Sequence, residues 1–202
     1  MSSIADVYRK EKGNLIVLSG PSGVGKGTIC KELLRYYSDI VYSISATTRK
    51  ARLGEVHGKD YFFYSKDEFL KMVEEDAFLE WAKVYDNYYG TPKLFVEEIT
   101  SRGKDCILEI DVQGALQVKE RKPEGVFIFI VPPSKEELIR RITCRGTENE
   151  KEVAKRMEKV DDEIALLPQY DYMVENDNLQ KAVELIRCII LAERTRIHNH
   201  KK

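Results

Sequence analysis

The 202-residue chain lacks several features that would assign it to a specialised class of protein. No segment approaches the roughly 18 consecutive apolar residues that a membrane-spanning helix needs. The first twelve residues hold no apolar core between their charges, so we expect no secretory signal. The four cysteines have no C-x-x-C spacing and no nearby histidine in a ligand pattern. A zinc site is therefore a poor hypothesis, and the cysteines are typical of reduced thiols in a cytoplasmic protein.

A strong net charge is also missing. Lys and Arg number 33 and Asp and Glu number 34, which gives a formal net charge of −1. Proteins that coat nucleic acids or bind anionic membranes usually carry a clear positive excess. We therefore expect neither nucleic acid nor a membrane as a partner, and the sequence leaves the oligomeric state open.

Short apolar runs and helix-like segments alternate along the chain, which is typical of an α/β protein. Hydrophobic residues make up 43% and charged residues 33%, enough for one well-buried core. The alternation predicts a parallel sheet with helices on both faces. Strands are expected at 14–19, 41–45, 105–110, 126–131 and 171–174. Helices are expected at 25–37, 92–102, 134–143, 149–167 and 178–197, the third with a capping box of Ser134 and Glu137.

Two regions interrupt this alternation. Residues 45–94 are rich in aromatic side chains and short strand-like pieces, and residues 134–165 carry many charges of both signs with few large apolar side chains. A segment that buries little apolar surface can move relative to the rest. We expect a core made of 1–44, 95–133 and 166–202, an inserted lobe at 45–94 and a mobile lid at 134–165.

A glycine-rich segment follows the first expected strand and opens the first expected helix. Small residues at this position let backbone N–H groups converge on a phosphate, and a lysine there reaches the β- and γ-phosphates of a nucleotide. The plain alternative is an ordinary glycine-rich turn. The strict motif has Ser or Thr directly after the lysine to bind Mg²⁺, but here a glycine stands there and a threonine follows. This P-loop consists of Gly20, Pro21, Ser22, Gly23, Val24, Gly25, Lys26, Gly27 and Thr28.

Two arginines after the second expected strand could bind a second phosphate. Arg49 and Arg52 are three residues apart and follow a run of hydroxyl side chains. Arginine binds phosphate with two parallel hydrogen bonds, and Ser and Thr add further donors. A solvated basic turn is the equally weighted alternative on these residues alone.

Several separate motifs, taken in order, resemble the guanylate kinase family, and the bacterial type in particular. They are GPSGVGKGT (20–28), SATTRKARLGEVHGKDYFF (45–63), FLEWAKVYDNYYGTP (78–92), ILEIDVQGA (107–115), FIFIVPPS (127–134) and RGTENE (145–150). The resemblance covers about residues 13–180. It implies the P-loop nucleoside monophosphate kinase fold and the reaction of ATP with GMP, with Mg²⁺ as cofactor.

The resemblance also assigns the GMP-binding residues. Glu80 would accept the adjacent N1–H and N2–H donors of guanine, a donor pair that adenine lacks. The family usually carries Ser at position 91 and Asp at position 109, so this chain changes both side chains. The resemblance places Ser45, Thr91 and Glu109 near the guanine, and Arg49, Arg52, Tyr61 and Tyr89 on the phosphate with Glu55 in support. For the tyrosines, the plain alternative is core packing.

The remaining assignments concern ATP and the transferred group. Asp111 could hold Mg²⁺ waters and serve both nucleotide sites, or could simply cap the following helix. Thr28 is a second metal candidate, directly or through water, and Asn176 matches a family segment near the adenine. The residues expected to stabilise the transferred phosphoryl group are Lys26, Arg52, Arg145 and Arg156. For the last two, the alternative is a helix surface of i,i+4 charge pairs. As whole-protein alternatives we consider a kinase for another nucleoside monophosphate and a non-catalytic binding module of the same fold.

Overall fold

The computed structural model describes residues 12–143 and 150–197, and for residues 150–156 and 158 it describes the backbone alone. Its centre is a five-stranded sheet in the order β2-β7-β1-β8-β9, whose neighbouring strands run parallel. This main sheet contains β2 (Ile40–Tyr42), β7 (Asp105–Glu109), β1 (Leu15–Ser19), β8 (Val126–Val131) and β9 (Tyr172–Glu175). The expected parallel α/β fold is confirmed.

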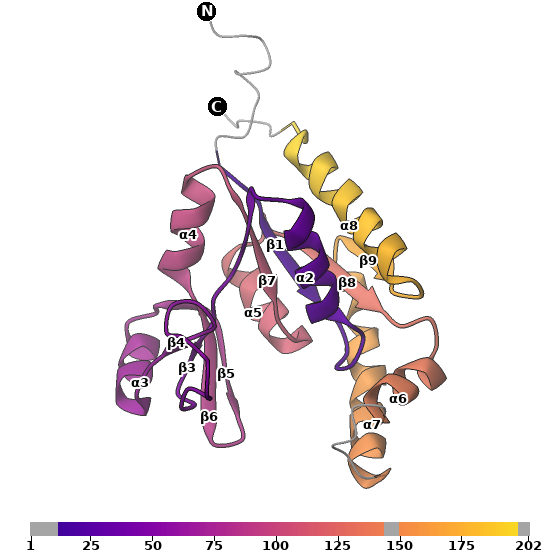
Figure 1. Cartoon of the computed structure of the whole chain (residues 1–202), viewed down its shortest axis with the longest axis horizontal. Coiled ribbons are helices and arrows are strands. Elements are labelled where there is room, and N and C mark those ends of the chain that lie inside the picture. Colours follow the sequence, from indigo (N-terminus) through magenta and orange to yellow (C-terminus); the bar gives the residue numbers. More distant parts are fainter. Residues whose placement is uncertain (1–11, 144–149, 198–202) are drawn as a thin grey trace, which may run out of the picture.

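Helices cover both faces of the main sheet (Figure 1). Side chains alternate along a strand, so β1 sends Ile16 and Leu18 to one face and Leu15 and Val17 to the other. The helices on the first face are α2 (Lys26–Tyr36) and α8 (Leu179–Arg194), and those on the second are α4 (Lys93–Ser101) and α5 (Val112–Arg121). Burial on both faces explains why these strands are continuous apolar runs in the sequence.

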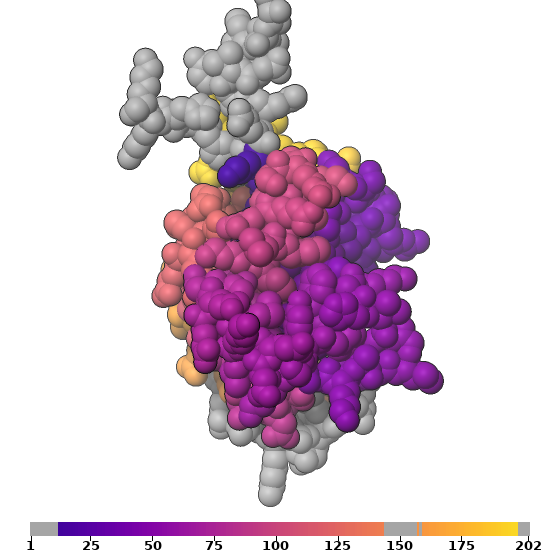
Figure 2. Space-filling view, turned by 90° about the vertical axis from the view of Figure 1, so that its left-hand side faces the viewer, coloured from indigo at the N-terminus to yellow at the C-terminus, as the bar shows by residue number. Residues whose placement is uncertain are grey.

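A smaller sheet projects from one end of the main sheet, and Figure 2 views the molecule from that side. Its order is β4-β3-β6-β5, with β3 and β4 parallel and the other pairs antiparallel. Aromatic packing holds it together, since the rings of Phe69 and Phe78 stack with their centroids 4.5 Å apart. The small sheet and its helix consist of β3 (Ala46–Thr47), β4 (Phe62–Phe63), α3 (Lys66–Glu74), β5 (Phe78–Val84) and β6 (Asn87–Pro92).

One side chain joins the small sheet to the main body. The backbone N–H of Trp81 on β5 donates to Oε1 of Gln117 at 3.2 Å, and the carbonyl of Trp81 accepts from Nε2 of Gln117 at 3.2 Å. Gln117 belongs to α5, so its amide pairs with the strand backbone as a neighbouring strand would. The middle of β5 is therefore fixed to the body.

Two further helices lie at the same end of the main sheet, across from the small sheet (Figure 1). They are α6 (Lys135–Thr143) and α7 (Glu150–Ala165), followed by the 3₁₀ turn η1 (Leu167–Gln169). Ser134 accepts a hydrogen bond from the backbone of Glu137 at 3.2 Å, which is half of the expected capping box. The Glu137 carboxylate instead accepts from Arg140 at 2.6 Å and Arg141 at 2.8 Å, because charged donors lie one turn along the helix.

Several expected boundaries are wrong by one to three residues, and for two of them the structure shows the cause. The second strand ends at Tyr42 rather than 45, because Ala46 and Thr47 pair with the small sheet instead. The helix expected from 92 begins at Lys93, because Pro92 still pairs with Phe78 across β5 and β6. Within the described ranges, no helix has both the length and the apolar character needed to cross a membrane.

Candidate functional site

The P-loop connects β1 to α2, and Gly20 and Gly25 show why it contains glycine. Gly20 has φ +137° and Gly25 has φ +99°, both in the region that favours glycine. A Cβ on Gly20 would lie 2.3 Å from the carbonyl oxygen of Ile130, and one on Gly25 would lie 2.6 Å from Nδ2 of Asn176. Helix α2 begins at Lys26 without a side-chain cap, so its first N–H groups remain available for an anion.

The side chain of Lys26 folds back onto the start of this loop. Its Nζ donates to the carbonyl oxygens of Gly20 at 2.6 Å and Pro21 at 3.1 Å. Burial lowers the pKa of Lys26, and the nearby carboxylate of Glu109 opposes that shift more than any other acid. A pocket of about 410 Å³ opens beside the lysine and is lined by Gly20, Ser22, Lys26, Glu109, Ile110, Asp111, Lys159, Val160 and Glu163.

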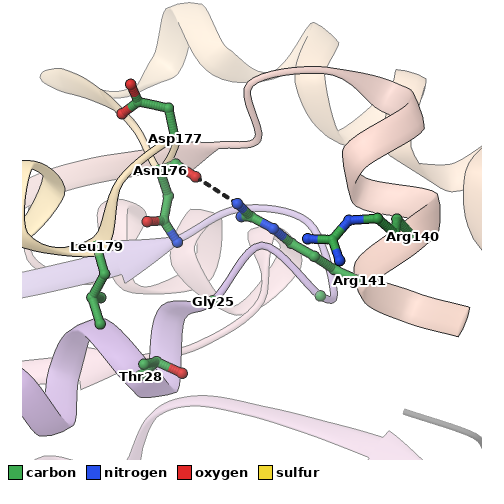
Figure 3. Close-up of a pocket in the computed structure, with 8 residues that line it drawn as sticks. Gly25, Thr28, Arg140, Arg141, Asn176, Asp177 and Leu179 are labelled. Carbon is green, nitrogen blue, oxygen red and sulfur yellow. Dashed lines mark hydrogen bonds between the residues drawn. The ribbon is translucent and has the colours of Figure 1, made fainter. Parts of the chain in front are cut away.

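A second pocket of about 390 Å³ lies beside the other end of the P-loop (Figure 3). Asn176, which is buried, donates from Nδ2 to the carbonyl of Val24 at 2.8 Å. Arg141 donates to the carbonyl of Asn176 at 3.0 Å, which ties α6 to the segment after β9. The pocket is lined by Gly23, Gly25, Thr28, Arg140, Arg141, Asn176, Asp177 and Leu179. The two metal candidates, Thr28 and Asp111, thus line different pockets.

The small sheet holds a buried carboxyl group at Glu80. Its side chain is 8% exposed, and Oε1 accepts a hydrogen bond from Oγ1 of Thr91 at 2.6 Å. A Cβ on Gly114 would lie 3.1 Å from Oε2 of Glu80 and 3.3 Å from Oδ1 of Asp111, so both carboxyl groups approach the start of α5. Burial raises the pKa of Glu80 to about 7, although the hydrogen bond from Thr91 acts to lower it. Asp111 also caps α5 by accepting from the backbone of Gly114 at 2.8 Å.

Glu109, expected beside Glu80, has different neighbours. Its Oε2 accepts a hydrogen bond from Oη of Tyr42 at 3.0 Å, and its carboxylate lies against Gly27. The acid that the structure brings close to Glu80 is Asp111. Ser45 lies before β3, where its carbonyl accepts from the backbone of Phe62 at 2.9 Å.

The basic pair expected to bind a phosphate forms an ordered cluster. Arg49 donates to both carboxylate oxygens of Glu55 at 2.9 Å, and the backbone N–H of Arg52 donates to the same group at 2.7 Å. These hydrogen bonds, chiefly the one from the Arg49 side chain, lower the pKa of Glu55 to about 2. The guanidinium of Arg49 lies 5.3 Å from the ring centroid of Tyr61, whose ring is 6.3 Å from that of Tyr89. The side chain of Arg52 is exposed.

Two expected arginines have no side-chain description. Arg145 lies outside the described residues, and Arg156 lies in α7, where the backbone alone is described. Some of the residues that line the two pockets carry no sequence motif of their own. Leu179 follows the Asn178 cap of α8, and Lys159 and Glu163 lie one turn apart on α7. The contact of Tyr42 with Glu109 also has no sequence signal, because only the pairing of β2 with β7 brings the two side chains together.

The raised pKa of Glu80 leads to a stability prediction. Because its carboxyl group has a pKa of about 7 in the folded state against 4.5 ordinarily, the folded state keeps a proton that the unfolded state releases. Stability is therefore expected to fall as pH rises from 4.5 to 7, by about 3 kcal/mol at most. Glu80→Gln cannot titrate, so its Tm advantage over the wild type should grow between pH 5 and pH 8. A Tm difference that stays constant over that range would contradict the assigned environment.

The fold and the glycine-rich loop together define a P-loop kinase: a parallel sheet flanked by helices, with the loop between β1 and the helix that follows it. A profile described as guanylate kinase matches residues 12–193. The chain belongs to the guanylate kinase family.

Three relatives illustrate the match. The chain is 59% identical to a guanylate kinase of Caldanaerobacter subterraneus subsp. tengcongensis, over 95% of this chain and 93% of the relative. It is 56% identical to the guanylate kinase of Halalkalibacterium halodurans, over 91% of this chain and 90% of the relative. The crystal structure of guanylate kinase from Anaplasma phagocytophilum is 36% identical, covers 93% of this chain and 89% of its own, and superposes with a TM-score of 0.73.

Proposed function

We propose that this protein transfers the γ-phosphoryl group of ATP to GMP, giving ADP and GDP, with ATP on the P-loop and GMP on the small sheet. The family and its bacterial relatives support the activity. The observation that supports GMP as the phosphoryl acceptor is the buried carboxyl group of Glu80. Guanine presents two adjacent donors, N1–H and N2–H, which one carboxylate can accept together, whereas adenine presents no such pair.

The phosphate of GMP is proposed to bind at the other end of the small sheet. Arg49 is oriented by two hydrogen bonds to Glu55, so little side-chain entropy is lost when it binds an anion. Arg52, Tyr61 and Tyr89 would complete the phosphate site. The GMP phosphate is already ionised at pH 7, so it can attack the γ-phosphorus directly and no general base is needed.

On the ATP side, we propose that the P-loop amides and Lys26 bind the phosphates and that the pocket of Asn176 and Leu179 receives the adenosine. Phosphoryl transfer needs in-line positioning and positive charge around the moving group. Lys26 supplies part of that charge. Arg145 and Arg156 of the proposed lid, residues 134–165, would supply the rest when the lid and the lobe of 45–94 close and exclude water.

The residues beside Lys26 also fit the magnesium ion of Mg-ATP. In the described ranges, no group of three His, Cys, Asp or Glu residues forms a cage that could hold a metal ion alone. Mg²⁺ commonly binds through one or two carboxylates, several waters and the phosphates of a nucleotide. Glu109, Asp111 and Glu163 line the pocket with Lys26 and offer oxygen donors of this type. When bound, the ion would neutralise charge on the phosphate oxygens. We place the reaction in the cytoplasm.

A comparison of acceptors tests the proposal. GMP, AMP, UMP and dTMP are each offered with Mg-ATP, and ADP release is measured in a coupled assay. We expect GMP to be phosphorylated and the other three to react at least about 10³-fold more slowly, because they leave the buried carboxyl group without its two donors. A preference for another acceptor would favour a different nucleoside monophosphate kinase. No ADP release with any acceptor would favour a binding module.

A further inference from the structure

One face of helix α5 runs along the small sheet. Three positions on α5 are spaced by three and four residues, which places them on the same side of a helix. They are Gly114, Gln117 and Arg121. The first two lie against neighbouring residues of β5, Glu80 and Trp81, and the third forms an ion pair with Asp76 in the turn before that strand. This face of α5 therefore follows the segment that carries the proposed guanine-binding carboxyl group.

The contact at Gly114 leaves the carboxyl group of Glu80 little room toward α5. A Cβ on Gly114 would lie 3.1 Å from Oε2 of Glu80. The other carboxyl oxygen, Oε1, accepts a hydrogen bond from Oγ1 of Thr91 on β6 at 2.6 Å. The side chain is thus held between α5 and β6, so a small shift of β5 against α5 would move it.

Strand β5 needs support at this point, because it lies at the edge of the small sheet and its ladder with β6 is irregular. The register between the two strands shifts between Phe78 and Glu80, and such a bulge disrupts the ladder locally. Gln117 supplies additional pairing. Its amide accepts from the backbone N–H of Trp81 and donates to the carbonyl of Trp81, both at 3.2 Å. Two hydrogen bonds to one backbone unit set both the distance and the register of β5 against α5.

The link from Arg121 to Asp76 is of a different kind. The two side chains are 39% and 59% exposed, and exposed ion pairs contribute little to stability. Asp76 also pairs with Lys93 at 3.3 Å. Arg121 thus ties the same segment to α5 without contacting the backbone beside Glu80.

We propose that Gln117 is a positioning residue for guanine selectivity: by pairing with the backbone of Trp81, it fixes where the carboxyl group of Glu80 meets the purine. The inference rests on the proposed function, since it takes Glu80 as the group that binds guanine. One carboxylate accepts N1–H and N2–H together only when both of its oxygens lie within hydrogen-bond distance of those donors. A displacement of about 1 Å is enough to lose part of that interaction.

Acceptor selectivity in Gln117→Met tests this role. Methionine keeps the approximate length of the side chain but removes both hydrogen bonds to Trp81. Inosine monophosphate (IMP) presents N1–H but no 2-amino group, so it offers Glu80 one donor in place of two. We expect Gln117→Met to lower kcat/KM for GMP by about 30-fold, mainly through KM, and to lower the preference for GMP over IMP by about 10-fold. The KM for Mg-ATP should stay near the wild-type value.

Two control variants separate positioning from general support. Arg121→Met removes the exposed link between α5 and the same segment, and Gln180→Met makes the same chemical change at an exposed position on α8. Both are expected to keep the wild-type preference for GMP over IMP. A loss of folded protein lowers the rates with both acceptors equally and leaves their ratio unchanged. Thermal melts without ligand check the fold. If Gln117→Met does not fold, Gln117→Asn, whose amide is one methylene closer to the helix, takes its place with the same expected direction.

The proposal is overturned if the Gln117 variant keeps the wild-type preference for GMP over IMP. It is also overturned if Arg121→Met lowers that preference by as much, since α5 would then act only as a general support of the small sheet. Failure of the proposed function is distinct, because the wild type itself would then show no preference for GMP over IMP.

Discussion

Glu80→Gln is expected to lower kcat/KM for GMP by up to about 10⁴-fold, because a site built to hydrogen-bond a base strongly disfavours a mismatch. The glutamine amide presents one acceptor and one donor where guanine needs two acceptors, so an N–H would face an N–H in a buried site. Initial rates over a range of GMP concentrations at saturating Mg-ATP measure the effect. The KM for ATP should stay near the wild-type value, since Glu80 lies on the small sheet and not on the P-loop.

Glu74→Gln provides the control for this substitution. It makes the same chemical change on the same part of the chain, but Glu74 is exposed on α3. The wild type should also bind GMP more tightly as pH rises through about 7, the pKa of Glu80, because only the ionised carboxyl group accepts both donors. Glu80→Gln should lack that pH dependence. If Glu80→Gln phosphorylates GMP as well as the parent does, Glu80 is not in the base site.

Lys26→Met is expected to reduce kcat by about 10³-fold at saturating substrates, the size of loss seen when one preorganised charge or donor is removed from a transition state. Methionine keeps the length and the apolar part of the side chain but removes the ammonium group. Burial lowers the pKa of Lys26, so the ammonium group is costly to keep in the ligand-free protein. The variant should therefore melt at the wild-type temperature or above it.

Lys31→Met is the matched control, since Lys31 is an exposed lysine on the same helix. Single-turnover rates with preformed enzyme, Mg-ATP and GMP separate the chemical step from product release. An equal loss of kcat and of ATP affinity in Lys26→Met would mean that the lysine only binds the nucleotide. A kcat close to that of Lys31→Met would remove Lys26 from the transition state.

The P-loop and the main sheet could be predicted because their signals are local. Strands buried on both faces are continuous apolar runs, and the glycine-rich turn between β1 and α2 is contiguous in sequence. The small sheet was expected only as an inserted lobe with short strand-like pieces, such as YFFY at 61–64. β3 and β4 are two residues long, too short to show any alternation, and they are held by aromatic packing between distant residues.

The site was harder to predict at the end of β7. Glu109 and Asp111 are two residues apart, a spacing that in a continuing strand would put both on one face. The strand ends at Glu109, however, and Asp111 becomes the cap of α5. The chain turns between them, so Asp111 lies near Glu80 and Glu109 lies against Gly27. Such a turn depends on which helix follows and where it packs, and a short motif does not encode that.

The amide pairing between Gln117 and Trp81 holds the β5 edge of the small sheet against α5. The pairing lies midway along β5, and β4 forms the opposite edge of the sheet, so we expect any rotation of the sheet to displace the β4 edge, next to Tyr61, more than the β5 edge. The proposed guanine site beside Glu80 is then expected to keep its shape better than the proposed phosphate site around Arg49. Trp81 is the sole tryptophan of the chain and adjoins Glu80 in the sequence, so its intrinsic fluorescence provides a label-free reporter of the proposed guanine site.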